Sequence, residues 1–102
     1  MSINVWQAWQ QYSTQNYTPW KREIALYEMG ARHYSQADIT REIKTGWDIL
    51  HKVDEFMRAL PRTSDMRQYF LDIKSAIRTQ LGVLEKMKSG TTTNNPFIVN
   101  FE

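Results

Sequence analysis

The sequence predicts an all-α fold: a small helical bundle in which a long antiparallel helical hairpin packs against shorter aromatic-rich N-terminal helices. Two observations lead to this prediction. Apolar residues recur at spacings of three and four between residues 39 and 60 and again between residues 66 and 87, as they do on one face of a helix. In addition, most of the three prolines and four glycines lie where helices would begin or end.

The first fifth of the chain is unusual because residues 1–20 contain no charged side chain but five aromatic rings. We expect one helix over roughly residues 3–15 and a second from Pro19 to near His33. Thr18 would be the N-cap of the second helix, with proline at its first helical position. Gly30 would be a mild interruption within it, costing about 1 kcal/mol relative to alanine.

A third helix is expected after Ser35, which forms a capping-box-like pair with Asp38. Its apolar seam consists of Ile39, Ile43, Gly46, Leu50, Val53, Met57 and Leu60. Gly46 within this seam has two interpretations: it admits a bulky neighbour such as an aromatic ring, or it is simply a tolerated small residue.

The fourth helix follows a turn at residues 61–64, with Thr63 or Ser64 as its cap. Its stripe consists of Met66, Phe70, Ile73, Ile77, Leu81, Leu84 and Met87. The short turn predicts an antiparallel hairpin, whose core would be thin without the N-terminal helices as a third layer. We therefore expect one helical domain over residues 1–90. Residues 91–102 form a C-terminal tail that is first polar and then apolar.

Composition excludes several classes of protein. The 13 Lys and Arg against 11 Asp and Glu give a net charge of +2, and the charges are interspersed, so nucleic acid is not a favoured partner. The absence of cysteine excludes disulfides and thiolate metal sites. No apolar run approaches the ~20 residues of a membrane span, and no secretory signal pattern is present. We expect a cytoplasmic protein that does not bind membranes.

Catalytic motifs are also absent from the sequence. His33 and His51 lack a second ligand at a metal-binding spacing, and the adjacent Asp54 and Glu55 point in different directions from a helix. There is no phosphate-binding glycine loop and no nucleophile motif. We therefore expect no enzymatic activity, no metal and no cofactor.

Aromatic residues are the remaining functional signal, because such side chains are enriched at protein interfaces. Trp20, Tyr27 and Phe70 lie within good apolar stripes and are expected in the core. Trp6 and Trp9 have no charged face beside them to mark which side meets water, and Trp47 lies one position off its seam. The candidate partner contacts are Trp6, Trp9, Trp47, Phe97 and Phe101.

Several short segments resemble the FlaF family of flagellar biosynthesis regulators. Residues 5–10 (VWQAWQ) look like the family's YxAY opening, and the Thr18–Pro19 pair precedes a charged helix start at residues 21–24. Residues 45–50, 67–73 and 96–100 resemble the later family segments in the same order. The resemblance implies a small helical cytoplasmic protein that binds flagellin and affects its synthesis or export, without enzyme activity or cofactor.

Together these observations favour a protein-binding function. The resemblance to the FlaF family implies a more specific function, that of a flagellin-specific export chaperone or regulator that covers an amphipathic helix of its partner. The alternative is a small phage or viral assembly protein that self-associates through its apolar termini. Partner identity and homo-oligomerisation stay open at this stage.

Overall fold

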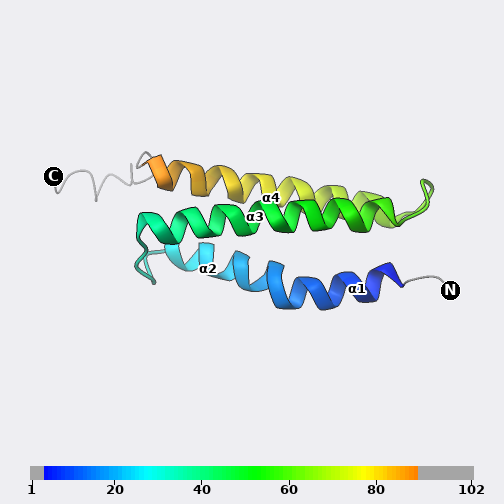
Figure 1. The fold of residues 1–102 in the computed structure, drawn as a ribbon, viewed down its shortest axis with the longest axis horizontal. Coiled ribbons are helices and arrows are strands. Elements are labelled where there is room, and N and C mark those ends of the chain that lie inside the picture. Colours follow the sequence, from blue (N-terminus) through cyan, green and yellow to red (C-terminus); the bar gives the residue numbers. More distant parts are fainter. Residues whose placement is uncertain (1–3, 90–102) are drawn as a thin grey trace.

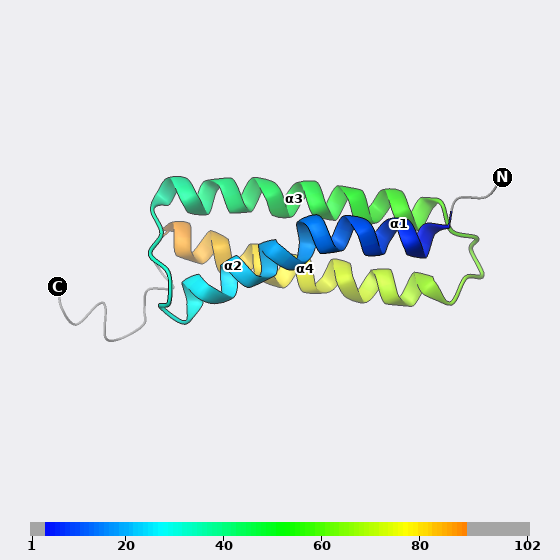
Figure 2. The ribbon, with the colours of Figure 1, turned by 90° about the horizontal axis from the view of Figure 1, so that it is seen from below.

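The computed structural model describes residues 4–89, and each regular element in this range is helical. In chain order these are α1 (Val5–Tyr12), the π-helical segment η1 (Ser13–Tyr17), α2 (Thr18–Glu28), α3 (Gln36–Arg58) and α4 (Met66–Ser89). α3 and α4 form an antiparallel hairpin, and the N-terminal helices lie along one face of it (Figures 1 and 2). The molecule is a rod with extents of 59 × 21 × 18 Å. The predicted all-α bundle is confirmed.

The N-terminal part is one continuous helix, so the predicted break at Thr18 is wrong. The backbone of Tyr17 and Thr18 stays in the right-handed helical region. Pro19 has no N–H, and its ring crowds the carbonyl group of Gln15, which disfavours an ordinary α-helical turn. The chain widens into a π turn instead, in which the Thr18 N–H donates to the Ser13 carbonyl five residues earlier. The Thr–Pro pair therefore marks a π segment inside a long helix.

The end of α2, predicted near His33, also differs. Gly30 adopts a positive φ of 76°, which side chains other than glycine rarely allow. The Gly30 N–H donates to the Tyr27 carbonyl at 3.2 Å, and the Ala31 N–H donates to the Leu26 carbonyl at 2.9 Å. These two bonds form a Schellman motif, so the glycine ends the helix rather than interrupting it.

The hairpin helices begin with the predicted caps. The Ser35 hydroxyl accepts from the Asp38 N–H at 3.1 Å, and the Asp38 carboxylate accepts from the Ser35 N–H at 2.8 Å, which completes a capping box. At the start of α4, the Ser64 hydroxyl accepts from the Met66 N–H at 3.2 Å, so Ser64 rather than Thr63 is the cap. The short connection between the helices produces the antiparallel pairing.

The core lies between the hairpin and the N-terminal helix, which confirms the predicted third layer. At Gly46 of α3 the two layers are in close contact. A Cβ atom on Gly46 would lie 2.5 Å from Cζ2 of Trp20 and 2.6 Å from Cδ2 of Leu81. The missing side chain therefore admits the Trp20 ring, whose Nε1 donates to the Glu42 carbonyl at 2.8 Å. Of the two interpretations of Gly46, close approach by an aromatic ring is the one observed.

Candidate functional site

An aromatic cluster surrounds Trp9, which is 1% exposed. The rings that contact it belong to Tyr12, Tyr17, Phe56 and Phe70, at centroid distances of 5.5–6.2 Å. The Phe56 and Phe70 rings meet the indole edge-on, a favourable geometry. The Trp9 Nε1 donates to the Tyr69 hydroxyl at 3.0 Å. Trp9 therefore joins α1 to both helices of the hairpin.

This burial corrects the placement of Trp9 among the candidate partner contacts. Its indole is enclosed by the hairpin and presents no surface to a partner. The expectation that Trp20, Tyr27 and Phe70 belong to the core is confirmed, since all three are buried. In α1, Val5 and Trp9 are buried and Trp6 is exposed, so the side that carries Val5 and Trp9 faces the core.

An exposed aromatic edge is formed by Trp6 of α1 and Tyr69 of α4. Their centroids are 5.3 Å apart with planes at 70°, and each side chain is 39% exposed. Tyr69 is held in place by the hydrogen bond from Trp9 and by the Phe70 ring, whose centroid is 5.4 Å away. The edge is thus a pair of large rings in mutual contact and open to solvent, the kind of feature that anchors protein interfaces.

Tyr69 was missed by the sequence analysis. It lies outside the apolar stripe of α4, one position before the buried Phe70. Periodicity predicts which residues enter the core, but it does not predict which residues at the margin of a stripe meet another exposed ring. The only signal was a large aromatic side chain at the edge of the stripe.

Trp47 is 46% exposed and lies on a different face from the aromatic edge. Phe56, which contacts Trp9 of α1, follows Trp47 by nine residues, or two and a half helical turns, so the two side chains point to opposite sides of α3. Asp54, seven residues after Trp47 and on its side of the helix, forms an ion pair with Lys74 of α4. The side of the hairpin that carries Trp47 is therefore turned away from α1 and α2.

We call this side the uncovered face, and it consists of Ile43, Trp47 and Asp54 of α3 with Leu71, Lys74, Arg78, Gly82 and Glu85 of α4. No described helix packs over it (Figures 1 and 2). The other two candidate contacts, Phe97 and Phe101, lie outside the described residues.

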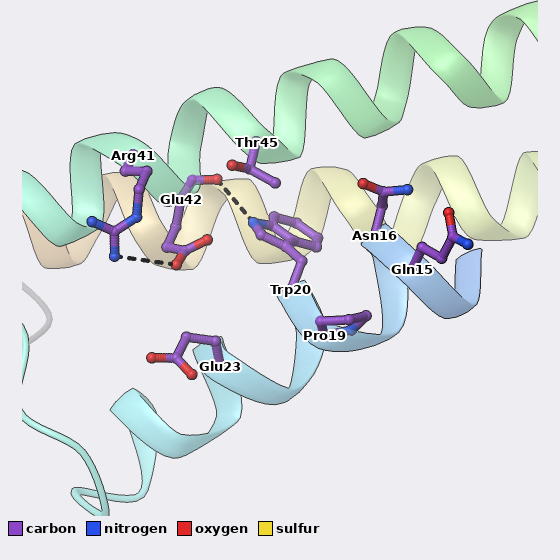
Figure 3. Close-up of a pocket in the computed structure, with 8 residues that line it drawn as sticks. All are labelled: Gln15, Asn16, Pro19, Trp20, Glu23, Arg41, Glu42 and Thr45. Atoms are coloured by element: carbon purple, nitrogen blue, oxygen red, sulfur yellow. Dashed lines mark hydrogen bonds and ion pairs between the residues drawn. The ribbon is translucent and has the colours of Figure 1, made fainter. Parts of the chain in front are cut away.

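A polar groove of about 420 Å³ separates the N-terminal helix from α3 (Figure 3). It is lined by Gln15, Asn16, Pro19, Trp20, Glu23, Arg41, Glu42 and Thr45. Burial raises the pKa of the Glu42 carboxyl, and Arg41, whose Nη2 lies 3.7 Å from that carboxylate, acts in the opposite direction. Glu23 pairs with Arg32 at 3.1 Å. The groove is suited to hydrogen bonding, and its lining includes no histidine or cysteine that could act as a nucleophile or base.

Within residues 4–89, no group of three or more His, Cys, Asp or Glu side chains is arranged to hold a metal ion. In the same range, none of the helices has the length and apolar character needed to cross a bilayer. Comparison with protein-family models, with curated proteins and with solved structures finds no significant match to this chain. Within residues 4–89, the aromatic edge and the uncovered face carry the exposed aromatic side chains described above, so they are the candidate binding surfaces.

Proposed function

We propose that this chain is a non-enzymatic protein-binding protein that receives an amphipathic helix of its partner at the aromatic edge. The observation that carries this proposal is the fixed, solvent-open pair of Trp6 and Tyr69. Two large rings held by their own domain lose little conformational freedom when a partner packs on them, which favours binding. Apolar side chains on one face of a partner helix would pack against both rings.

Flagellin is the most concrete partner because of the resemblance to the FlaF family. The chain would then act as a flagellin-specific export chaperone or regulator of flagellar biosynthesis. By covering the apolar face of a flagellin helix, it would prevent premature assembly. In this role it needs no catalytic group, and the partner would leave Trp47 on the uncovered face untouched.

The test is a calorimetric titration of the full chain with monomeric flagellin from the same organism, comparing Trp6→Ala with Trp47→Ala. Both variants remove a partly exposed indole from a helix, so they are matched controls. Loss of an interface tryptophan typically costs about 2 kcal/mol or more, so Trp6→Ala should weaken binding by roughly 30-fold. Trp47→Ala should bind as the unmodified chain does. Absence of saturable flagellin binding, or an equal effect of both variants, would refute this assignment.

The alternative is a phage or viral assembly protein that self-associates through its apolar termini, favoured by the apolar run at residues 96–101. Deletion of residues 91–102 should then abolish concentration-dependent association in light scattering. Deletion of residues 1–17 is not informative, because Val5, Trp9 and Tyr17 belong to the core and their loss would damage the fold itself.

A further inference from the structure

Trp47 differs from the other three tryptophans in having no hydrogen-bond, ring or cation–π partner within residues 4–89. Trp9 and Trp20 each donate an indole hydrogen bond, and Trp6 packs edge-on against a tyrosine. The Trp47 side chain makes no hydrogen bond, ring contact or cation–π contact with the described chain, although nearly half of it is exposed. An exposed indole of this kind is a typical anchor of an interface.

Gly82 is the second unexplained feature of the uncovered face. It lies inside α4, where glycine is less favourable than alanine, and a Cβ atom placed on it would meet nothing within 4 Å. Gly46 on α3 presents the opposite case, because the Trp20 ring occupies the space that its missing side chain leaves. No contact within the described chain accounts for Gly82.

Trp47 and Gly82 lie on the same side of the hairpin and within about 3 Å of the same level. Gly46 faces Leu81 across the α3–α4 contact. Trp47 and Gly82 are the next residues on the two helices, and in an antiparallel pair one step along each chain turns both side chains to the same side. The uncovered face thus presents a projecting indole next to a position without a side chain.

We propose that a second copy of this chain covers the uncovered face, with a two-fold axis parallel to the hairpin. This symmetry places α3 of each copy over α4 of the other at equal levels. Trp47 of each copy then enters the space above Gly82 of the other copy, as Trp20 does at Gly46 within one chain. Such an interface is isologous, because one indole and one glycine from each copy form two identical contacts.

The charges of the uncovered face and its margin fit this arrangement. Two pairs come together across the interface: Lys44 meets Glu85, and Asp54 meets the Lys74 side chain of the other copy as well as that of its own chain. Each pair joins opposite charges, which favours the proposed register. Glu85 forms no ion pair within residues 4–89, so it is available to Lys44 of the other copy.

The size of the face also suits a dimer. The 24 residues of α4 span about 36 Å, and two helices side by side are about 20 Å wide, so the face measures on the order of 700 Å². A standard protein interface buries about 800 Å² on each partner. Because only Trp47 and Leu71 are large exposed apolar residues on this face, we expect a reversible dimer with a dissociation constant in the micromolar range.

The test is sedimentation equilibrium of the full chain from about 1 to 500 μM, a range chosen to span micromolar dissociation. The unmodified chain should show a reversible monomer–dimer equilibrium. Gly82→Leu should weaken dimerisation at least tenfold, because its side chain would occupy the space for the indole, while its Cβ meets nothing within 4 Å in its own chain. Ala76→Leu adds an apolar side chain at an exposed position of the same helix, turned away from the uncovered face, and should dimerise normally. Glu85→Lys should weaken the dimer, and adding Lys44→Glu should restore it.

Three outcomes would overturn the proposal. The chain could be monomeric throughout, Gly82→Leu could dimerise as Ala76→Leu does, or deletion of residues 90–102 could abolish the dimer. A monomer whose Trp47 becomes more accessible to a quencher after that deletion would assign the uncovered face to residues 90–102 instead. The inference does not depend on flagellin binding, because Trp6→Ala should leave the dimer unchanged.

Discussion

Replacing Gly46 with alanine should destabilise the bundle, although alanine is the better helix former. The new Cβ would lie 2.5 Å from Cζ2 of Trp20 and 2.6 Å from Cδ2 of Leu81, well inside normal carbon contact. The Trp20 ring cannot retreat freely, because it is buried and its Nε1 is bound to the Glu42 carbonyl at 2.8 Å. The structure must therefore accept strain or lose that hydrogen bond.

The expected size of the effect follows from three contributions. Overpacking a core position costs about 1–3 kcal/mol. Weakening the Trp20 hydrogen bond adds about 1 kcal/mol, and the better helix propensity of alanine returns about 1 kcal/mol. The net loss is about 1–3 kcal/mol, which lowers Tm by roughly 4–24 °C for a domain of this size.

Urea unfolding followed by circular dichroism, at a concentration low enough to keep the chain monomeric, measures this loss. Gly82→Ala is the matched control, because the same change at Gly82 meets nothing within 4 Å. That variant should gain up to about 1 kcal/mol. If Gly46→Ala proved as stable as the unmodified chain, the close packing of Trp20 on this glycine would be refuted.

Three further substitutions probe the fold. Trp9→Phe removes the indole donor to Tyr69 and leaves unfilled space, so it should cost about 2 kcal/mol in urea unfolding; an unchanged midpoint would contradict the buried position. Ser35→Ala should cost about 1 kcal/mol by removing the capping box, and no change in the midpoint would mean that the box does not form. Burial, followed by the hydrogen bond to Glu23, raises the pKa of Tyr27 to about 12 from its usual 10.0, so the folded state favours the neutral phenol. The associated stability should be intact below pH 10 and lost as pH rises towards 12, and Tyr27→Phe should make this loss less steep in unfolding measurements across that range.

The hairpin could be predicted from the sequence because local signals and periodicity agree there. The capping box at Ser35 and the apolar seam that follows it each specify a helix, and the structure has both. At Gly46 the sequence left two interpretations open, room for a large neighbour or a tolerated small residue, and the structure shows the first. The sequence could not predict which ring fills that space, because Trp20 lies on another helix and reaches Gly46 only in the folded bundle.

The N-terminal helix was harder to predict because two local signals were misleading. A threonine followed by proline commonly starts a helix, but here the widened π turn accommodates Pro19 and the helix continues. The sequence of α1 has no charge to mark its exposed side, but the spacing of Val5, Trp9 and Tyr12 predicts that these three share one side of the helix. Charge does not separate Trp6 from Trp9, and the packing on the hairpin shows that Trp9 is the buried ring and Trp6 the exposed one.

Because the molecule is a rod, end-to-end and side-by-side association change its maximum dimension differently. The start of α1 and the end of α4 lie at opposite ends of the rod (Figure 1), whose long axis measures 59 Å. Chains joined through their termini would add end to end, and the maximum dimension in small-angle X-ray scattering would grow with each added copy. Chains paired along the uncovered face would thicken while keeping nearly the same maximum dimension, so a single scattering profile of the associated state distinguishes a filament-forming subunit from a laterally paired rod.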